Sequence, residues 1–163
     1  MRVFVTVGMG PWSFDRLLMA IIPLCDRHEI LVQRGNSKVP LPCDSIPFFS
    51  FKDTLQHIAM ADIIITHAGN TVRLVQQHGK LPIAMAREKR FQEMANDHQV
   101  SYLHYEAQLG RVLALWNPQE LPLLVDSHPA KQVKFQQDFH AQKVTSDREI
   151  YHMMTALCQK WHP

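Results

Sequence analysis

The side chains best suited to chemistry fall in three short segments, each of which follows an apolar run. Gly8-Met9-Gly10 offers a backbone that a ligand can approach closely. Thr66–Thr71 (THAGNT) brings an imidazole, a carboxamide and a hydroxyl to the start of a predicted helix. Arg87–Gln99 (REKRFQEMANDHQ) combines basic side chains with a polar Asn-Asp-His-Gln run. Backbone N–H groups at a helix start, together with such donors, are suited to hold a diphosphate.

Each segment also has a purely structural interpretation. Glycines between a strand and a helix are needed for the turn itself. Asn70 or Thr71 would serve as a simple helix N-cap beside a turn residue, His67, and Asn96 or Asp97 would cap the helix that follows a solvated charged loop. The His-Ala-Gly sequence beside Asn-Thr, and four polar side chains of different chemistry at residues 96–99, nevertheless favour ligand sites.

The apolar runs predict a parallel sheet that positions these loops. Continuous β-branched runs are typical of strands buried on both faces, and strand–turn–helix–strand spacing is typical of a βαβ unit. The clearest unit is the strand Asp62–Thr66, the helix Thr71–His78 and the strand Leu81–Ala86. The other predicted strands are Val3–Val7, Glu29–Gln33, Ile46–Phe49 and Arg111–Leu115, and the other predicted helices are Phe14–Leu24, Ser50–Met60 and Asn96–Gln108, with a short helix or turn over Pro118–Val125. The fold class is therefore α/β, a single Rossmann-like doubly wound parallel sheet, whose ligand sites lie at the carboxyl ends of the strands.

The length and the polar end of the chain predict its organisation. The 163 residues suit one domain with a tail, and are too few for an enzyme that closes two large domains around its substrates. We assign residues 1–125 to the Rossmann-like domain and residues 126–163 to a C-terminal helical extension, which is rich in Gln and Lys.

Charge and cysteine content exclude several classes of protein. The 17 Lys and Arg against 15 Asp and Glu leave a net charge of +2, too small for a nucleic-acid partner to be expected. Cys25, Cys43 and Cys158 are odd in number and widely spaced, so neither a disulfide framework nor a zinc site is indicated. The histidines have no metal-ligand spacing, and we expect no metal. The amino-terminal run lacks the features of a signal peptide and no stretch is long enough to span a bilayer, which predicts a cytoplasmic protein.

Five segments, in order, resemble the C-terminal, donor-binding domain of family 28 glycosyltransferases. They are FVTVG…FDRLL, LVQRG, ADIIITHAG, HGKLPIAMARE and NDHQ, and the resemblance covers roughly residues 1–115. The order and spacing are most similar to the short stand-alone versions. These are the catalytic subunit of two-part bacterial exopolysaccharide glycosyltransferases and the eukaryotic subunit that adds the second N-acetylglucosamine to dolichol-linked sugar.

The resemblance implies one half of a GT-B fold and a metal-independent hexosyltransferase. UDP-sugar would be the donor substrate, with no cofactor. A membrane-associated subunit would supply the acceptor-binding half, the lipid-linked acceptor and the general base, and would hold this chain at the inner face of the membrane. Whether the chain also forms a homo-oligomer stays open. The alternatives are a non-catalytic nucleotide-sugar-binding or regulatory module of the same fold, and an unrelated Rossmann-like domain that binds another phosphorylated ligand.

By position, the resemblance makes His67 the catalytic residue of the diphosphate loop. The family's ribose-binding Glu or Gln is replaced by Leu74, or by Val75 in an ungapped alignment, and Gln76 and Arg73 are the polar side chains nearby. The residues that the resemblance assigns to donor binding are Gly8, Gly10, Gly69, Asn70, Thr71, Arg87, Asn96, His98 and Gln99.

Overall fold

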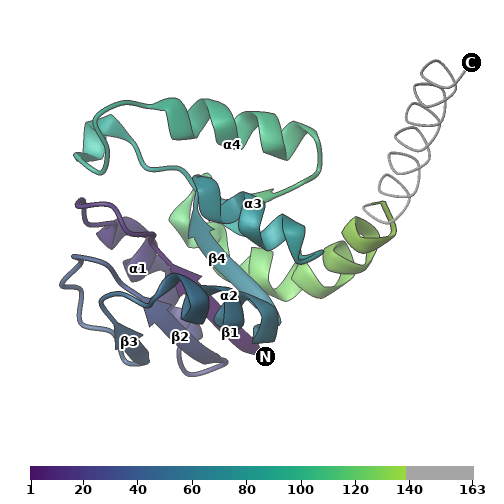
Figure 1. The fold of residues 1–163 in the computed structure, drawn as a ribbon, viewed down its shortest axis with the longest axis horizontal. Helices are drawn as coiled ribbons and strands as arrows, with labels where there is room; N and C mark the ends of the chain where they lie inside the picture. The colour runs from purple at the N-terminus through teal and green to yellow at the C-terminus, as the bar shows by residue number, and fades with distance from the viewer. Residues whose placement is uncertain (139–163) are drawn as a thin grey trace, which may run out of the picture.

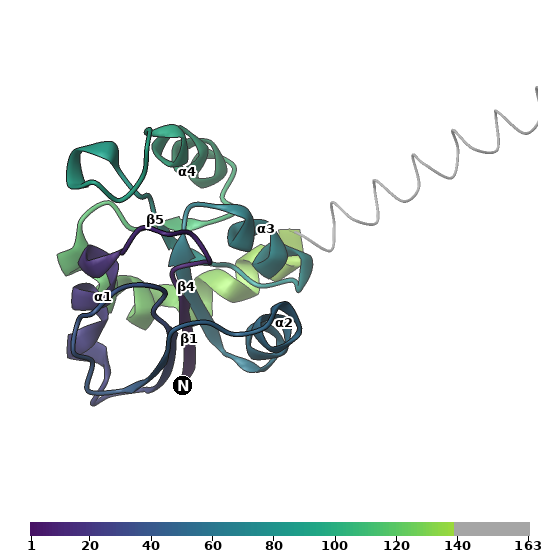
Figure 2. The ribbon, with the colours of Figure 1, turned by 60° about the vertical axis from the view of Figure 1, so that its left-hand side comes forward.

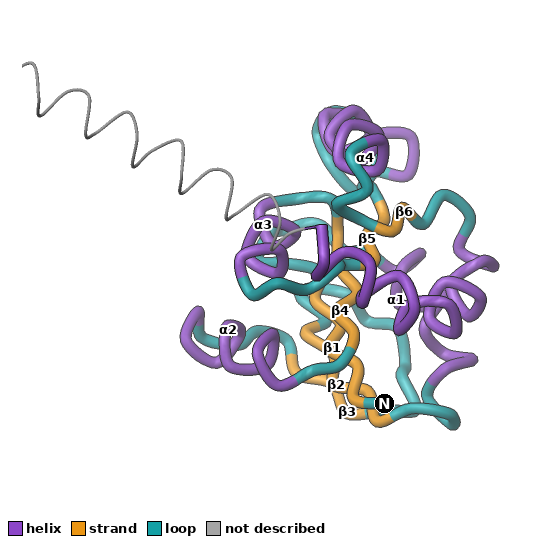
Figure 3. The backbone as a smooth tube through the Cα atoms, turned by 90° about the vertical axis from the view of Figure 1, so that its right-hand side faces the viewer, coloured by secondary structure: helices purple, strands orange, loops and turns teal. Residues whose placement is uncertain are grey.

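The computed structural model describes residues 1–138, which form one parallel sheet with helices on both faces (Figures 1 and 3). The strand order is β3-β2-β1-β4-β5-β6. The chain thus moves outward from β1 to one edge, returns to β4 beside β1, and then moves to the other edge. This reversal makes the sheet doubly wound and puts its topological switch point, where ligands bind in such folds, between the carboxyl ends of β1 and β4. The strands are β1 (Arg2–Thr6), β2 (Glu29–Gln33), β3 (Asp44–Ile46), β4 (Ile63–His67), β5 (Ile83–Met85) and β6 (Leu113–Ala114).

The two central strands are apolar along nearly their whole length because both faces of the sheet are covered. Val3–Thr6 and Ile63–Thr66 are buried at every position, and their register pairs Val3 with Ile63. The edge strand β3, by contrast, is exposed throughout. Burial on both faces is what a parallel sheet in a doubly wound fold requires.

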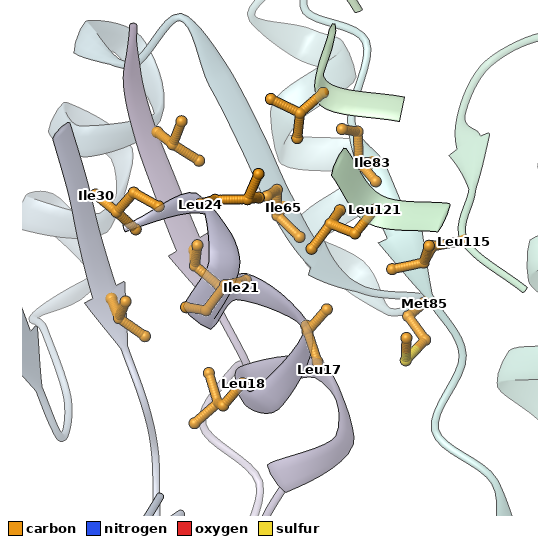
Figure 4. Packing of buried hydrophobic residues seen from close by; sticks show 14 of the residues in the cluster. Leu17, Leu18, Ile21, Leu24, Ile30, Ile65, Ile83, Met85, Leu115 and Leu121 are labelled. Carbon is orange, nitrogen blue, oxygen red and sulfur yellow. The ribbon is translucent and has the colours of Figure 1, made fainter. Parts of the chain in front are cut away.

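Helices from different parts of the chain cover the two faces. α1 and the helix formed by residues 121–138 pack on one face, and α2, α3 and α4 pack on the other. Figure 4 shows the first core, in which α1 lays Leu17 and Ile21 against Ile65 and Leu121. The helices are α1 (Asp15–Ile21), η1 (Ile22–Leu24), α2 (Phe51–Met60), α3 (Asn70–Gln77), η2 (Lys89–Phe91), α4 (His98–Gln108) and η3 (Pro118–Glu120).

Within residues 1–138, each predicted strand and helix overlaps an observed element, but β3 shares only Ile46 with the predicted strand Ile46–Phe49. α2 begins where predicted because the Ser50 hydroxyl accepts a hydrogen bond from the Asp53 N–H at 3.1 Å. β3 ends at Ile46, three residues earlier than predicted, because Pro47 has no N–H to continue the ladder. Of the predicted last strand, Arg111–Leu115, only Leu113–Ala114 pairs with β5.

The predicted domain boundary falls inside a continuous helix. Residues 121–138 are helical, and His128 and Phe135 are buried on the inner side of that helix. The His128 ring lies 2.7 Å from the Leu81 carbonyl oxygen. The first part of the predicted extension is therefore part of the Rossmann-like core, and residues 139–163 lie outside the described residues. Within residues 1–138, no helix has the length and apolar character needed to cross a membrane.

Candidate functional site

The loops after β1 and β4 meet at the carboxyl edge of the sheet. Thr6 and Thr66 are the last residues that pair between β1 and β4, and the Thr66 hydroxyl donates to the Thr6 carbonyl at 2.9 Å. In Figure 2 the loop after β1 passes close to the start of α3. The sheet therefore brings two of the three predicted segments together at the switch point.

The imidazole of His67 fills a slot between two glycines. A Cβ atom added to Gly8 would lie 2.5 Å from Cε1 of the His67 ring, and a Cβ added to Gly69 would lie 2.4 Å from its Nε2. Both distances are far inside van der Waals contact. Gly8 also has a φ of +78°, which favours glycine on its own account. In this structure the two glycines make room for His67, which thereby joins the two loops.

His67 is neutral at physiological pH. Burial and, to a smaller extent, the positive charge of Arg87 lower the pKa of its imidazole to about 4, while the Thr6 carbonyl opposes the shift. A neutral imidazole has one N–H donor and one acceptor nitrogen. It can therefore donate a hydrogen bond to a ligand oxygen, but it adds no positive charge to the site.

The start of α3 offers backbone N–H groups that no side chain caps. Gly69 is the N-cap residue, and no side-chain hydrogen bond satisfies the first turn. The interpretation of Asn70 or Thr71 as a simple N-cap is therefore wrong. Asn70 is exposed and Thr71 half-buried at this helix start, where the helix dipole favours an anion.

Arg87, predicted to bind the donor, is directed into the protein. Its side chain is almost fully buried, and its guanidinium donates to the carbonyls of Val7 (2.7 Å), Ser13 (2.8 Å), Trp12 (3.2 Å) and, on its own loop, Glu93 (3.3 Å). Burial lowers its pKa to about 10 while the Glu93 carboxylate opposes the shift, so the group stays charged. In this structure Arg87 shapes the loop after β1.

An ion pair that the sequence analysis missed connects α1 to the loop after β5. Arg16 Nη2 lies 2.8 Å from the buried carboxylate of Glu93 and 2.8 Å from the Ala86 carbonyl oxygen. Arg16 Nη1 also lies 3.3 Å from the Glu88 carboxylate. A basic residue in the first turn of a helix opposes the helix dipole. The position of Arg16 in the first turn of α1 could therefore have indicated, from the sequence, that Arg16 has an acidic partner.

Residues 96–99, where α4 begins, include both buried and exposed side chains. The Gln99 side chain is buried and accepts a hydrogen bond from the Arg87 N–H at 3.1 Å. Asn96 and His98 are exposed and bond to each other at the start of α4. Three residues of this segment were predicted to bind the donor. Asn96 and His98 have side chains exposed to solvent, whereas the buried Gln99 side chain supports the loop after β5.

The positions that replace the family's ribose-binding residue do not face this edge. Leu74 and Val75 pack in the core with Phe4. Gln76 donates to the Glu106 carboxylate at 2.8 Å, and both Gln76 and Arg73 line a cavity at the opposite end of the strands. The suggestion that either could stand in for the ribose-binding residue is not supported by this geometry.

Exposed aromatic side chains stand at the same edge. Phe48 and Phe51, which follow β3, are 42% and 61% exposed, and Trp12 after β1 is 38% exposed. Aromatic faces left in solvent are suited to stack a nucleotide base. The aromatic residues Phe48, Phe49 and Phe51, the first two at the end of the predicted strand Ile46–Phe49, were the signal for this feature, and it was missed.

A small cavity lies beyond Arg16, at the carboxyl ends of β5 and β6. It measures about 260 Å³. His104 and Trp116 on its wall stack with ring centroids 4.2 Å apart, and Glu88 and Arg90 add charges of both signs. Within residues 1–138, no three His, Cys, Asp or Glu side chains are grouped to hold a metal ion.

Comparisons with known proteins bear on the fold. No protein-family model and no curated protein matches the sequence. Among solved structures, the chain is similar to the crystal structure of CalG4, the calicheamicin glycosyltransferase, with a TM-score of 0.56 and 13% identity. The fold is that of one half of a GT-B glycosyltransferase. The match covers 95% of this chain and 44% of that enzyme, so the chain spans less than half of its length.

The packing of His67 between Gly8 and Gly69 predicts effects of very different size for two glycine substitutions in these loops. Gly69→Ala places a methyl group on the His67 ring and should destabilise the fold by about 1–3 kcal/mol. Gly10→Ala meets its nearest atom, in Trp12, at 3.7 Å and should change the free energy of unfolding by less than about 0.5 kcal/mol. Urea unfolding measures both values. Equal losses of unfolding free energy in the two variants would contradict the close packing of the His67 ring against Gly69.

The environment of His67 predicts a pH dependence. In the unfolded chain its pKa is about 6.5, so between pH 6.5 and pH 4 the unfolded state binds a proton that the folded state does not. This contribution to stability is complete above pH 6.5 and falls as the pH drops toward 4. The His67→Asn variant should lose this component in urea unfolding measured across that range. An NMR titration of the His67 ring with a midpoint near 6.5 would contradict the assignment.

Proposed function

We propose that this chain is the donor-binding subunit of a UDP-sugar-dependent glycosyltransferase. It would act on a lipid-linked acceptor in polysaccharide or glycolipid biosynthesis, as a metal-independent hexosyltransferase. The observation that carries the proposal is the uncapped start of α3 beside a neutral imidazole, at the switch point of a fold that forms half of a GT-B enzyme.

The diphosphate of the donor would lie against the first turn of α3. The N–H groups of residues 70 and 71, the Asn70 amide and the Thr71 hydroxyl would donate to its oxygens, with the His67 N–H beside them. In glycosyl transfer, negative charge grows on the departing UDP as the bond to the sugar breaks. A fixed helix dipole and fixed donors stabilise that charge more in the transition state than in the ground state.

The two ends of the donor would extend along the carboxyl edge in opposite directions. The base would stack on an exposed aromatic side chain after β3, Phe48 or Phe51. The sugar would reach toward Asn96 and His98, whose side chains are exposed. Arg87 and Gln99 would act from behind, by holding the loops in place.

The acceptor and the general base would come from a second subunit. The chain spans 44% of the glycosyltransferase that it resembles in fold. We propose a membrane-associated partner that faces the carboxyl edge and brings the lipid-linked acceptor to the donor, which would place this chain at the inner face of the membrane.

A second candidate function is a nucleotide-sugar-binding module without turnover. The observation that favours it is the apolar packing of Leu74 and Val75 where the related enzymes carry a ribose-binding Glu or Gln. Such a module would bind UDP-sugar at the same edge and would regulate a separate transferase. Sugar transfer by a reconstituted pair of subunits separates the two functions.

Calorimetry with UDP tests the proposed site. The Asn70→Ala variant should weaken UDP binding about 3- to 10-fold, since one hydrogen bond contributes ~0.5–1.5 kcal/mol. Gln77→Ala, an exposed position in the last turn of the same helix, is the matched control and should leave the affinity unchanged. No binding of UDP to the unmodified chain at millimolar concentration would overturn both candidate functions.

A further inference from the structure

A large cavity lies at the end of the sheet opposite to the candidate site. It measures about 930 Å³ and is bounded by α3, by the end of α4 and by the helix of residues 121–138. These segments are far apart in the sequence and surround the amino ends of β5 and β6. The volume is of the size that binds a small organic ligand.

Four basic side chains from three different segments line this cavity. Arg73 comes from α3, Arg111 from the turn before β6, and Lys131 and Lys134 from the long helix. All four are exposed, and the lining contains a single carboxylate, that of Asp138. The whole chain carries a net charge of only +2, so this excess of positive charge is local.

The neighbouring groups leave most of that positive charge unbalanced. The Glu106 carboxylate is buried and accepts a hydrogen bond from Gln76. Arg73 lies near the Tyr102 hydroxyl, which is neutral because burial raises its pKa. Burial lowers the pKa of His128, the Leu81 carbonyl opposes this shift, and the charge of Lys131 lowers the pKa to a smaller extent. The carboxyl ends of α3 and α4 add partial negative charge, which is smaller than four full positive charges.

The floor of the cavity is apolar. Leu81, Val112 and Phe135 line it and are each less than 10% exposed. A basic rim above an apolar floor matches a ligand that carries negative charge at one end and an apolar group at the other. Residues 139–163, which continue the chain from Asp138, contain three Lys or Arg and two Asp or Glu, a net charge of +1 with histidines neutral.

We propose that this cavity is a second binding site, for a phosphate ester joined to an apolar group. Arg73, Arg111, Lys131 and Lys134 would surround the phosphate, and the apolar group would lie over Leu81 and Phe135. A phospholipid and a soluble phosphorylated metabolite share this chemistry. The site is separate from the carboxyl edge and does not depend on the proposed function.

Calorimetry with octyl phosphate tests the recognition directly. The Lys131→Glu/Lys134→Glu variant should weaken binding about 30-fold, because two cations become anions. Lys38→Glu/Lys52→Glu makes the same change of charge at exposed positions outside the cavity and should change the affinity less than about 2-fold. If the Glu variant does not fold, Lys131→Gln/Lys134→Gln replaces it, with an expected loss of about 5-fold.

Two further probes define what is recognised. Octyl glucoside has the same chain without the phosphate and should bind at least about 10-fold more weakly than octyl phosphate. Sedimentation with phosphatidylglycerol–phosphatidylcholine vesicles then identifies the source. Binding to these vesicles that the Lys131/Lys134 variant loses supports a lipid, and binding to octyl phosphate alone supports a soluble ligand. The proposal is overturned if octyl phosphate does not bind, if octyl glucoside binds equally well, or if both charge variants behave alike.

Discussion

The buried guanidinium of Arg87 holds the carboxyl edge of the sheet together. Removing a full charge from water costs several kcal/mol, and the structure offsets this with four backbone carbonyls, the face of Phe14 and the nearby Glu93 carboxylate. Three of those carbonyls belong to the loop after β1. The path of that loop, and thus the position of Gly8 beside His67, depends on a residue that follows β5.

The buried position of Arg87 changes the roles that we assign to the residues resembling a donor site. Arg87 and Gln99 face inward and fix the loops, whereas Asn70, Asn96 and His98 have side chains exposed at the surface. His67 packs against two glycines, one of which, Gly69, is the N-cap residue of α3. The site therefore has an inner layer of buried side chains that fixes the loops. Only some of the residues that the resemblance assigns to donor binding are exposed to a ligand.

The strands and helices could be predicted because local sequence determines them. The apolar runs of β1 and β4 require burial on both faces, and Ser50 with Asp53 marks a helix start. The side-chain partners could not be predicted in this way. Which carbonyls Arg87 binds, and that Arg16 meets Glu93, depend on contacts between segments more than 70 residues apart. The helix across residues 121–138 was divided in the prediction because its polar outer face dominates the composition.

The central claim is that a nucleotide diphosphate binds where the loops after β1 and β4 meet. A titration of the ¹⁵N-labelled chain with UDP, followed by amide chemical shifts in NMR, tests it most directly. The account predicts that the largest shifts occur at Gly8, Gly69, Asn70 and Thr71, while the amides of residues 131–135 stay unchanged. Largest shifts around the basic cavity, or saturable binding that leaves Gly69 to Thr71 unmoved, would contradict it.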